Sequence, residues 1–196
     1  MIKMIPSLGL NMAVDQNKKI HPHKFTLWVG IGSIIMMFAG LTSAYIVKRE
    51  QPGWTSYSTP IAFYYSTGII LISSLTIFLA GKSFRERRMV RYKKLVTATA
   101  ILGVVFILLQ YLGFRHLWDT GTTLHGSGAG QFLYIIAGLH ALHVFGGVIA
   151  LFTLWLRAGN KRIRSYNVVP VDVVSTYWHF VDLLWIYLFI FFLMVQ

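Results

Sequence analysis

The 196-residue sequence contains no cysteine, and only 12% of its residues are charged. Without cysteine the chain can form no disulfide framework, no thiolate metal site and no cysteine nucleophile. An average soluble domain carries about twice this fraction of charged residues. The apolar residues, 56% of the chain, are gathered into long runs. This clustering excludes an ordinary soluble core and favours a membrane protein.

Acidic residues are also scarce, since six Asp and Glu stand against 18 Lys and Arg, which gives a formal net charge of +12. A charge of this size is often found in nucleic-acid-binding proteins. Here, however, the basic residues lie in short segments between apolar runs, where they orient a membrane protein. No basic surface of a folded domain is left to bind nucleic acid, so nucleic acid is not an expected partner.

Five apolar segments are long enough to cross a bilayer as helices, because a hydrocarbon core about 30 Å thick requires roughly 20 apolar residues. They are Phe25–Val47, Ile61–Ala80, Leu95–Leu112, Phe132–Leu156 and Val173–Val195. The predicted fold class is an all-α integral membrane protein, a bundle of five transmembrane helices. Residues 1–24 are predicted to form a cytoplasmic tail, since Pro6 interrupts their apolar residues and no signal-peptide cleavage site follows. Residues 25–196 form the transmembrane domain.

The Lys and Arg residues between the segments predict the orientation. Fifteen of the 18 lie in the N-terminal tail, between the second and third segments, or between the fourth and fifth. The other connections hold only Lys48, Arg49 and Arg115. Because Lys and Arg accumulate in cytoplasmic loops, the N-terminus is predicted to lie inside and the C-terminus outside.

Small residues in the first segment predict a close contact with another helix. Ser33, Gly40, Ser43 and Ala44 stand among large apolar residues. Small side chains let helix backbones approach each other in lipid, so we expect this helix to pack tightly against a neighbour there.

Two pairs of polar residues lie inside the predicted spans. His140 and His143 are three residues apart in the fourth segment, as are His179 and Asp182 in the fifth, so each pair shares a helix face. A rise of 1.5 Å per residue, counted from opposite membrane faces, places His143 and Asp182 at a similar depth. Inserting an ionised Asp at this depth of the bilayer costs on the order of 3 kcal/mol of free energy, so Asp182 should face protein and be paired or protonated. The pattern predicts a buried polar network that links the two helices.

From spacing alone, four interpretations of these residues stay open. Metal or haem ligation is disfavoured, because His140 and His143 share one face and a membrane di-iron enzyme needs more histidines. A proton relay is a second interpretation. Contact with lipid headgroups is a third, and it suits Arg115, His116 and His125 better. The favoured one is a network that fixes helix packing, with Trp178 and Trp185 as packing or lipid-facing aromatics. No residue is assigned a catalytic, cofactor-binding or metal-binding role.

The same residues carry a family resemblance. GLHALHVFGG, followed about thirty residues later by YWHFVDLLWIYLF, resembles the signature of subunit III of the haem–copper oxidases. WVGIGSIIMMFAGLTSAYIVKR and QYLGFRHLWDTG resemble two further segments of that family. The resemblance covers residues 25–196 and is to the short five-helix bacterial form, which lacks the first two of seven helices. One departure is that the family's Gly-Ser-Glu is here Gly32, Ser33 and Ile34, so no role of that glutamate carries over.

The resemblance implies an accessory subunit of an enzyme that couples oxygen reduction to proton pumping. Haem and copper are then expected in neighbouring subunits and no cofactor on this chain. The implied partners are subunits I and II and bound phospholipid, in the bacterial cytoplasmic (inner) membrane. Membership of a larger respiratory supercomplex is left open by the sequence. The implied role is to stabilise subunit I and support proton uptake. Cytochrome c is the favoured electron donor, with a quinol oxidase as the alternative. A free-standing membrane haem protein or a transporter that uses the His/Asp cluster is the rival class.

Overall fold

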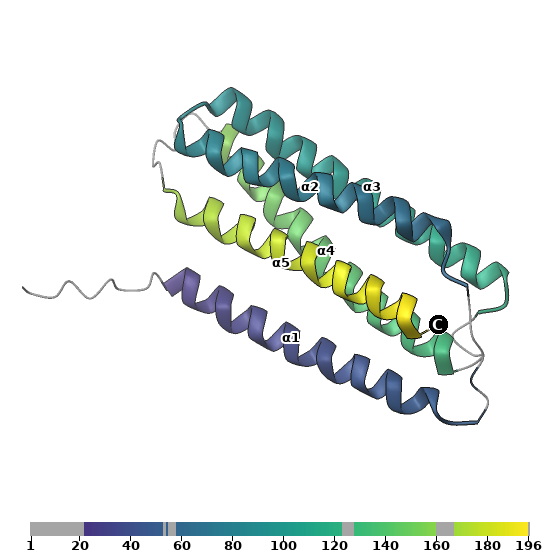
Figure 1. Cartoon of the computed structure of the whole chain (residues 1–196). Coiled ribbons are helices and arrows are strands. Elements are labelled where there is room, and N and C mark those ends of the chain that lie inside the picture. The colour runs from purple at the N-terminus through teal and green to yellow at the C-terminus, as the bar shows by residue number, and fades with distance from the viewer. Residues whose placement is uncertain (1–21, 53, 55–57, 123–127, 160–166, 196) are drawn as a thin grey trace, which may run out of the picture.

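The computed structural model describes residues 22–52, 54, 58–122, 128–159 and 167–195. These residues form five helices (Figure 1), which are α1 (Pro22–Arg49), α2 (Ile61–Arg85), α3 (Met89–Asp119), α4 (Gly128–Gly159) and α5 (Val169–Val195). All five predicted apolar segments are helical, and each helix is long and apolar enough to cross a membrane. Most of the predicted tail, residues 1–24, lies outside the described residues.

The helices are longer than the predicted spans. They run from 25 to 32 residues, or about 38–48 Å at 1.5 Å per residue, whereas the hydrocarbon core is about 30 Å thick. The largest difference is in α3, which begins at Met89 and ends at Asp119. Hydropathy marks only the apolar stretch, but the hydrogen-bonded helix continues into the charged residues on either side.

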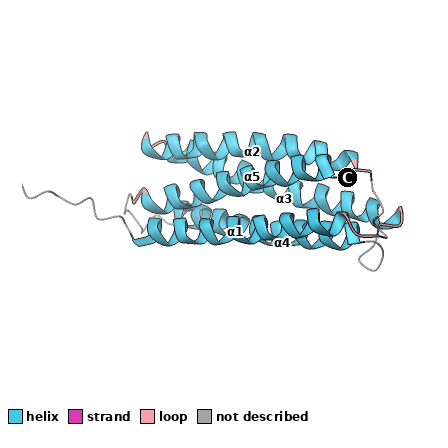
Figure 2. Cartoon of the chain, turned by 60° about the horizontal axis from the view of Figure 1, so that its bottom comes forward, coloured by secondary structure: helices cyan, strands magenta, loops and turns pink. Residues whose placement is uncertain are grey.

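Helix α5 lies at the centre of the bundle and runs beside α1, α2 and α4, while α3 runs beside α2 and α4. Side chains also join α3 to α5, since the ring of Trp178 packs on Gly103. Within the described residues, α1 contacts only α4 and α5. All five helices run nearly along one direction (Figure 2). The start of α1, the α2–α3 turn and the start of α5 lie at one end of the bundle, and the C-terminus lies at the other (Figure 1).

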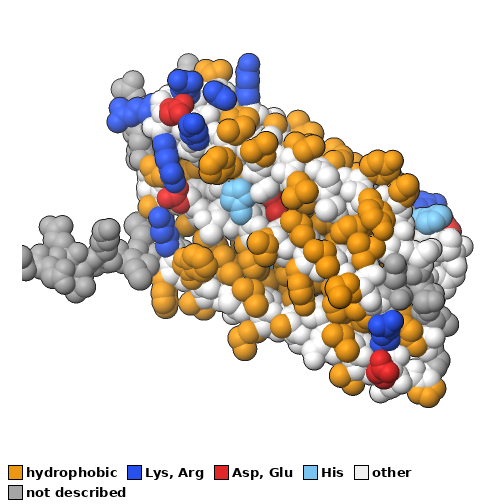
Figure 3. Space-filling model, viewed as in Figure 1, with side chains coloured by type: hydrophobic (Ala, Val, Ile, Leu, Met, Phe, Trp, Pro, Cys, Tyr) orange, Lys and Arg blue, Asp and Glu red, His pale blue; other side chains and the backbone are white. Residues whose placement is uncertain are grey.

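The surface between the two ends is apolar, as expected for a protein surrounded by lipid. Large hydrophobic side chains such as Met36, Val90 and Met194 are about three-quarters exposed. On the face seen in Figure 3, hydrophobic side chains predominate over the middle of the bundle, where a histidine and an acidic side chain are also visible, and the Lys and Arg side chains gather at its ends. The buried side chains of α5 include Trp178, Trp185 and Phe192.

Two glycines of α3 allow large aromatic rings to pack against the helix backbone. A β-carbon on Gly103 would lie 2.7 Å from the ring of Trp178, and one on Gly113 would lie 2.5 Å from the ring of Phe63. Both distances are far inside van der Waals contact, so these rings occupy space that only glycine leaves free.

The small residues of α1 do not form the predicted helix contact among the described residues. Ser33, Gly40, Ser43 and Ala44 are all exposed, and a β-carbon on Gly40 would have no neighbour within 4 Å. The buried face of α1 is instead made by larger residues, among them Phe38 and Tyr45. Helix α1 rests on α4 and α5 through these side chains, and no described helix covers its small-residue face.

Candidate functional site

Hydroxyl side chains of α2 bind the central helix α5. The indole Nε1 of Trp178 donates to Ser73 Oγ at 3.0 Å, and that of Trp185 donates to Thr67 Oγ1 at 3.0 Å. Ser74 Oγ shares a 2.6 Å hydrogen bond with Nδ1 of His179. Lipid offers no competing partner for these groups, so they fix the position of α5 on α2.

The same helix, α2, also binds α3. Gln110 Nε2 donates to Ser66 Oγ at 2.8 Å, and Thr76 Oγ1 and Thr99 Oγ1 share a hydrogen bond of 2.8 Å. These polar contacts of α2 were not predicted from the sequence. The pattern that indicates them is the recurrence of Ser and Thr at positions 66–67 and 73–74 of an apolar helix, because a spacing of seven residues returns to the same helix face.

Asp182 lies deep in the bundle, with 3% of its surface exposed. Ser74 lies beside its carboxyl group, but the Ser74 hydrogen bond goes to His179. Neither carboxylate oxygen of Asp182 has a hydrogen-bond partner among the described residues. The structure thus brings His179 and Asp182, one helical turn apart on α5, together at Ser74 of α2.

The two histidines of α4 face a different part of the bundle. His140 is 1% exposed, and neither of its ring nitrogens has a partner among the described residues. Its ring centroid lies 5.3 Å from that of Trp185 and 6.4 Å from that of Phe38. His143 Nδ1 bonds the carbonyl oxygen of Leu139, one turn earlier on the same helix, at 2.7 Å.

Among the described residues, no direct hydrogen bond joins Asp182 to His143, the two residues that were predicted to lie at a similar depth. The depth calculation used only the height of each residue along its helix, and the rotation of a helix about its axis decides which neighbour a side chain meets. His143 turns toward Phe38 of α1, with ring centroids 5.9 Å apart, whereas Asp182 turns toward Ser74 of α2.

The remaining predicted residues have separate positions. Trp178 and Trp185 are each 1% exposed, so they are packing aromatics rather than lipid-facing ones. Arg115 and His116 are exposed in the last turns of α3. His125 lies outside the described residues.

An ion cluster at the end of the bundle was not anticipated from the sequence. Asp172, in the first turn of α5, pairs with Lys24 Nζ at 3.3 Å and with Arg85 Nη2 at 3.0 Å. It thereby joins the start of α1, the end of α2 and the start of α5. The two basic residues are 148 and 87 positions apart from Asp172 in sequence, so no local pattern reveals the cluster.

The described residues contain no group of three or more His, Asp or Glu side chains that could hold a metal ion. Fold and site together define a helical multi-pass membrane protein whose buried polar residues connect helices. Residues 58–195 match the family described as "Cytochrome c oxidase subunit III". The chain belongs to this family, in its five-helix bacterial form.

Several bacterial relatives cover most of the chain. The chain is 33% identical over 166 residues to a "Probable cytochrome c oxidase subunit 3" of Mycobacterium bovis, an alignment that covers 82% of each chain. It is 33% identical over 177 residues to the "Cytochrome c oxidase subunit 3" of Corynebacterium diphtheriae, with 83% of this chain and 85% of the relative covered. The protein of the same description from Bacillus subtilis is 27% identical over 167 residues, with 83% and 81% covered.

Proposed function

We propose that this chain is a non-catalytic subunit of a proton-pumping cytochrome c oxidase in the bacterial cytoplasmic membrane. It carries no redox centre, stabilises subunit I, holds phospholipid and supports proton uptake. The observation that carries the proposal is the family match over residues 58–195. The buried polar residues agree with this proposal, because Ser73, Ser74 and Thr67 of α2 form hydrogen bonds with side chains of α5.

A tagged copy of the chain tests this role. Purified from membranes in mild detergent, it should bring with it subunits that contain haem and copper, and the complex should consume oxygen with reduced cytochrome c as donor. The chain separated from these subunits should show no Soret absorption band. A Soret band that stays with the separated chain, or purification without any haem-containing partner, would contradict the proposal.

The orientation proposed is N-terminus inside and C-terminus outside. Among the described residues, nine Lys and Arg lie at the end of the bundle where α1 starts, and three lie at the other end. Clusters of Lys and Arg at one end are retained in the cytoplasm. The tail formed by residues 1–24 would then be cytoplasmic.

Because the chain has no cysteine, single cysteines can report this orientation directly. Glu86→Cys lies in the α2–α3 turn, and Thr120→Cys lies just after α3, at the opposite end. In intact spheroplasts, a membrane-impermeant maleimide should label Thr120→Cys, and it should label Glu86→Cys only after lysis. The reverse pattern would show the opposite orientation.

Two groups of residues have proposed roles within the subunit. His140, His143, His179 and Asp182 form a polar interior between α4, α5 and their neighbours, in which the hydrogen bond from Ser74 of α2 to His179 holds α5 in place. Arg115 and His116, in the last turns of α3, contact lipid headgroups. The same role is proposed for His125, which lies outside the described residues. Neutral replacements at Arg115 and His116 should lower the phospholipid content of the purified complex and leave its haem content unchanged. Unchanged phospholipid content would contradict the role in headgroup contact.

A further inference from the structure

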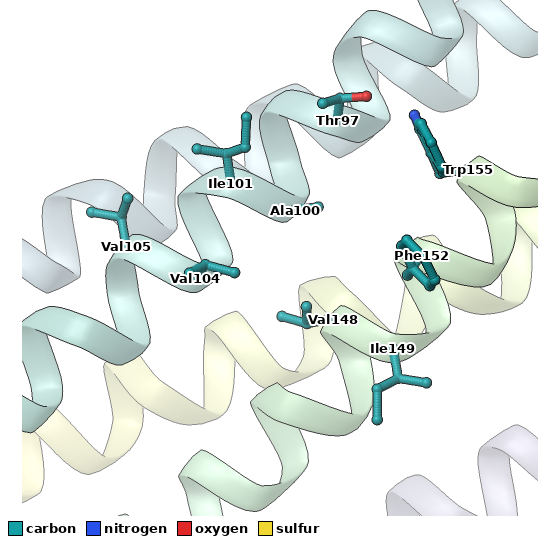
Figure 4. Close-up of a pocket in the computed structure, with 9 residues that line it drawn as sticks. All are labelled: Thr97, Ala100, Ile101, Val104, Val105, Val148, Ile149, Phe152 and Trp155. Atoms are coloured by element: carbon teal, nitrogen blue, oxygen red, sulfur yellow. The ribbon is translucent and has the colours of Figure 1, made fainter.

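A groove runs along the lipid-facing side of the contact between α3 and α4. We call it the α3–α4 groove. It has a volume of about 550 Å³, which falls within the usual range of ligand pockets, roughly 300–1,000 Å³. Its walls include Ala100, Ile101 and Val104 of α3 and Val148, Ile149 and Phe152 of α4. Ala100 and Val104 face Val148 and Phe152 across the groove (Figure 4).

The interior of the groove is apolar. The hydroxyl group of Thr97, at one end, is already bonded to the carbonyl oxygen of Lys93 in the same helix at 2.9 Å. The indole of Trp155 stands at the same end as Thr97 (Figure 4). Beyond this end, the described walls are aliphatic and phenyl side chains, which offer a polar ligand no hydrogen bond, whereas a hydrocarbon chain would need none.

The end of the groove at Thr97 and Trp155 is cationic. The Lys93 Nζ lies 5.6 Å from the ring centroid of Trp155, in the range of a cation–π contact. Lys93 and Lys94 precede Thr97 by four and three residues, so both lie on its side of α3. None of the ion pairs between described residues involves either lysine, so no carboxylate of the described part of the chain neutralises their charges.

The length of the groove matches one leaflet of a bilayer. From Thr97 to Val105 it extends about 12 Å along α3 at 1.5 Å per residue. Half of a hydrocarbon core is about 15 Å deep. An acyl chain that lies in the groove would therefore place its headgroup near Lys93 and Trp155, at the end of the bundle that is rich in lysine and arginine.

We propose that the α3–α4 groove holds one acyl chain of an anionic phospholipid, whose phosphate binds at Lys93 beside Trp155. A transmembrane helix of another subunit fits less well, since 12 Å of a helix about 10 Å wide fills about 900 Å³, well above the 550 Å³ of the groove. The inference deepens the lipid-binding part of the proposed function and rests on the membrane location proposed there.

Native mass spectrometry of the tagged oxidase complex, titrated with phosphatidylglycerol or phosphatidylcholine, tests the proposal. Ala100→Phe fills the groove and should remove one tightly held phosphatidylglycerol. Lys93→Gln should lower the preference for phosphatidylglycerol over phosphatidylcholine about fivefold, which is the contribution of one lysine at an anionic membrane surface. Leu108→Phe, exposed on α3 beyond the groove, and Lys82→Gln, exposed on α2, are the matched controls and should change neither quantity.

An unchanged lipid count in Ala100→Phe would overturn the inference, as would equal effects of Lys93→Gln and Lys82→Gln. A photo-reactive amino acid in place of Ile149 gives a second measurement that does not depend on the folding of Ala100→Phe. It should capture phospholipid, and capture of a polypeptide would also overturn the inference. The oxidase role is judged separately, by whether haem-containing subunits copurify with the unaltered chain.

Discussion

Gly103 of α3 gives the sharpest test of how the core is packed. In Gly103→Ala, the new β-carbon would lie 2.7 Å from Cη2 of Trp178, 3.1 Å from its Cζ2 and 3.2 Å from Cγ2 of Val148. The indole cannot easily move away, because its Nε1 donates to Ser73 at 3.0 Å and the residue is 1% exposed. The clash must therefore be relieved by shifting α3 and α5 apart.

The expected cost follows from two opposing effects. Overpacking a well-filled core costs about 1–3 kcal/mol, while Gly→Ala inside a helix gains about 1 kcal/mol from propensity. Because only at Gly113, among the described glycines, would an added β-carbon meet a closer neighbour than at Gly103, we place the overpacking near 3 kcal/mol and the net loss at about 2 kcal/mol. Gly68→Ala is the control, since a β-carbon there meets nothing within 4 Å. It should be neutral or slightly stabilising.

The assay is the thermal dissociation of this chain from the purified oxidase. Gly103→Ala should dissociate at a clearly lower temperature than Gly68→Ala. In a Trp178→Phe background, where the smaller ring no longer reaches the new methyl group, the effect of Gly103→Ala should shrink. Equal stability of the two alanine variants would refute the packing argument, as would an effect of Gly103→Ala that is just as large in the Trp178→Phe background as in the unaltered chain.

Three further changes have defined outcomes. Asp182→Ala should assemble poorly or lose activity faster with the haem spectrum retained, and abolished oxygen reduction in a fully assembled complex would contradict this. Thr67→Val and Trp185→Phe should show a coupling energy of about 0.6 kcal/mol, the mean for hydrogen bonds between membrane helices, in a double-mutant cycle of thermal stability; additive effects would count against the bond. Asp172→Asn should lower the thermal stability by less than about 1 kcal/mol per lost ion pair. The loss of stability should be larger at low salt than at high salt, and a loss that does not depend on salt would argue against an ionic origin.

The number of helices and their order could be read from the sequence because each span is a continuous apolar run. The predicted helix ends were too short, because hydropathy detects the apolar residues that face lipid and not the backbone hydrogen bonds that continue α3 from Met89 to Asp119. Burial of Asp182 was predicted correctly from the cost of an acid in lipid, and the structure leaves it 3% exposed.

The partners of the buried residues could not be predicted in the same way. Helix spacing gives the relative depth of His143 and Asp182, but contacts also depend on which face each helix turns toward its neighbours. That rotation is set by packing across the whole bundle, such as the fit of Trp178 against Gly103. The hydroxyl groups of α2 were not predicted because Ser and Thr residues are common in membrane helices, and only their recurrence at a spacing of seven residues distinguishes these.

The family resemblance leads us to expect a glutamate where this chain has Ile34, and the positions of the buried polar residues agree with an apolar side chain there. Ile34 is partly buried and packs against the main apolar cluster, on a helix whose contacts with α4 and α5 are made largely by apolar and aromatic residues such as Phe38 and Tyr45. The hydrogen bonds to the central helix come mostly from α2, which does not contact α1. The orientation of α5 therefore does not depend on a carboxyl group in α1, and an apolar residue at position 34 leaves the polar interior intact.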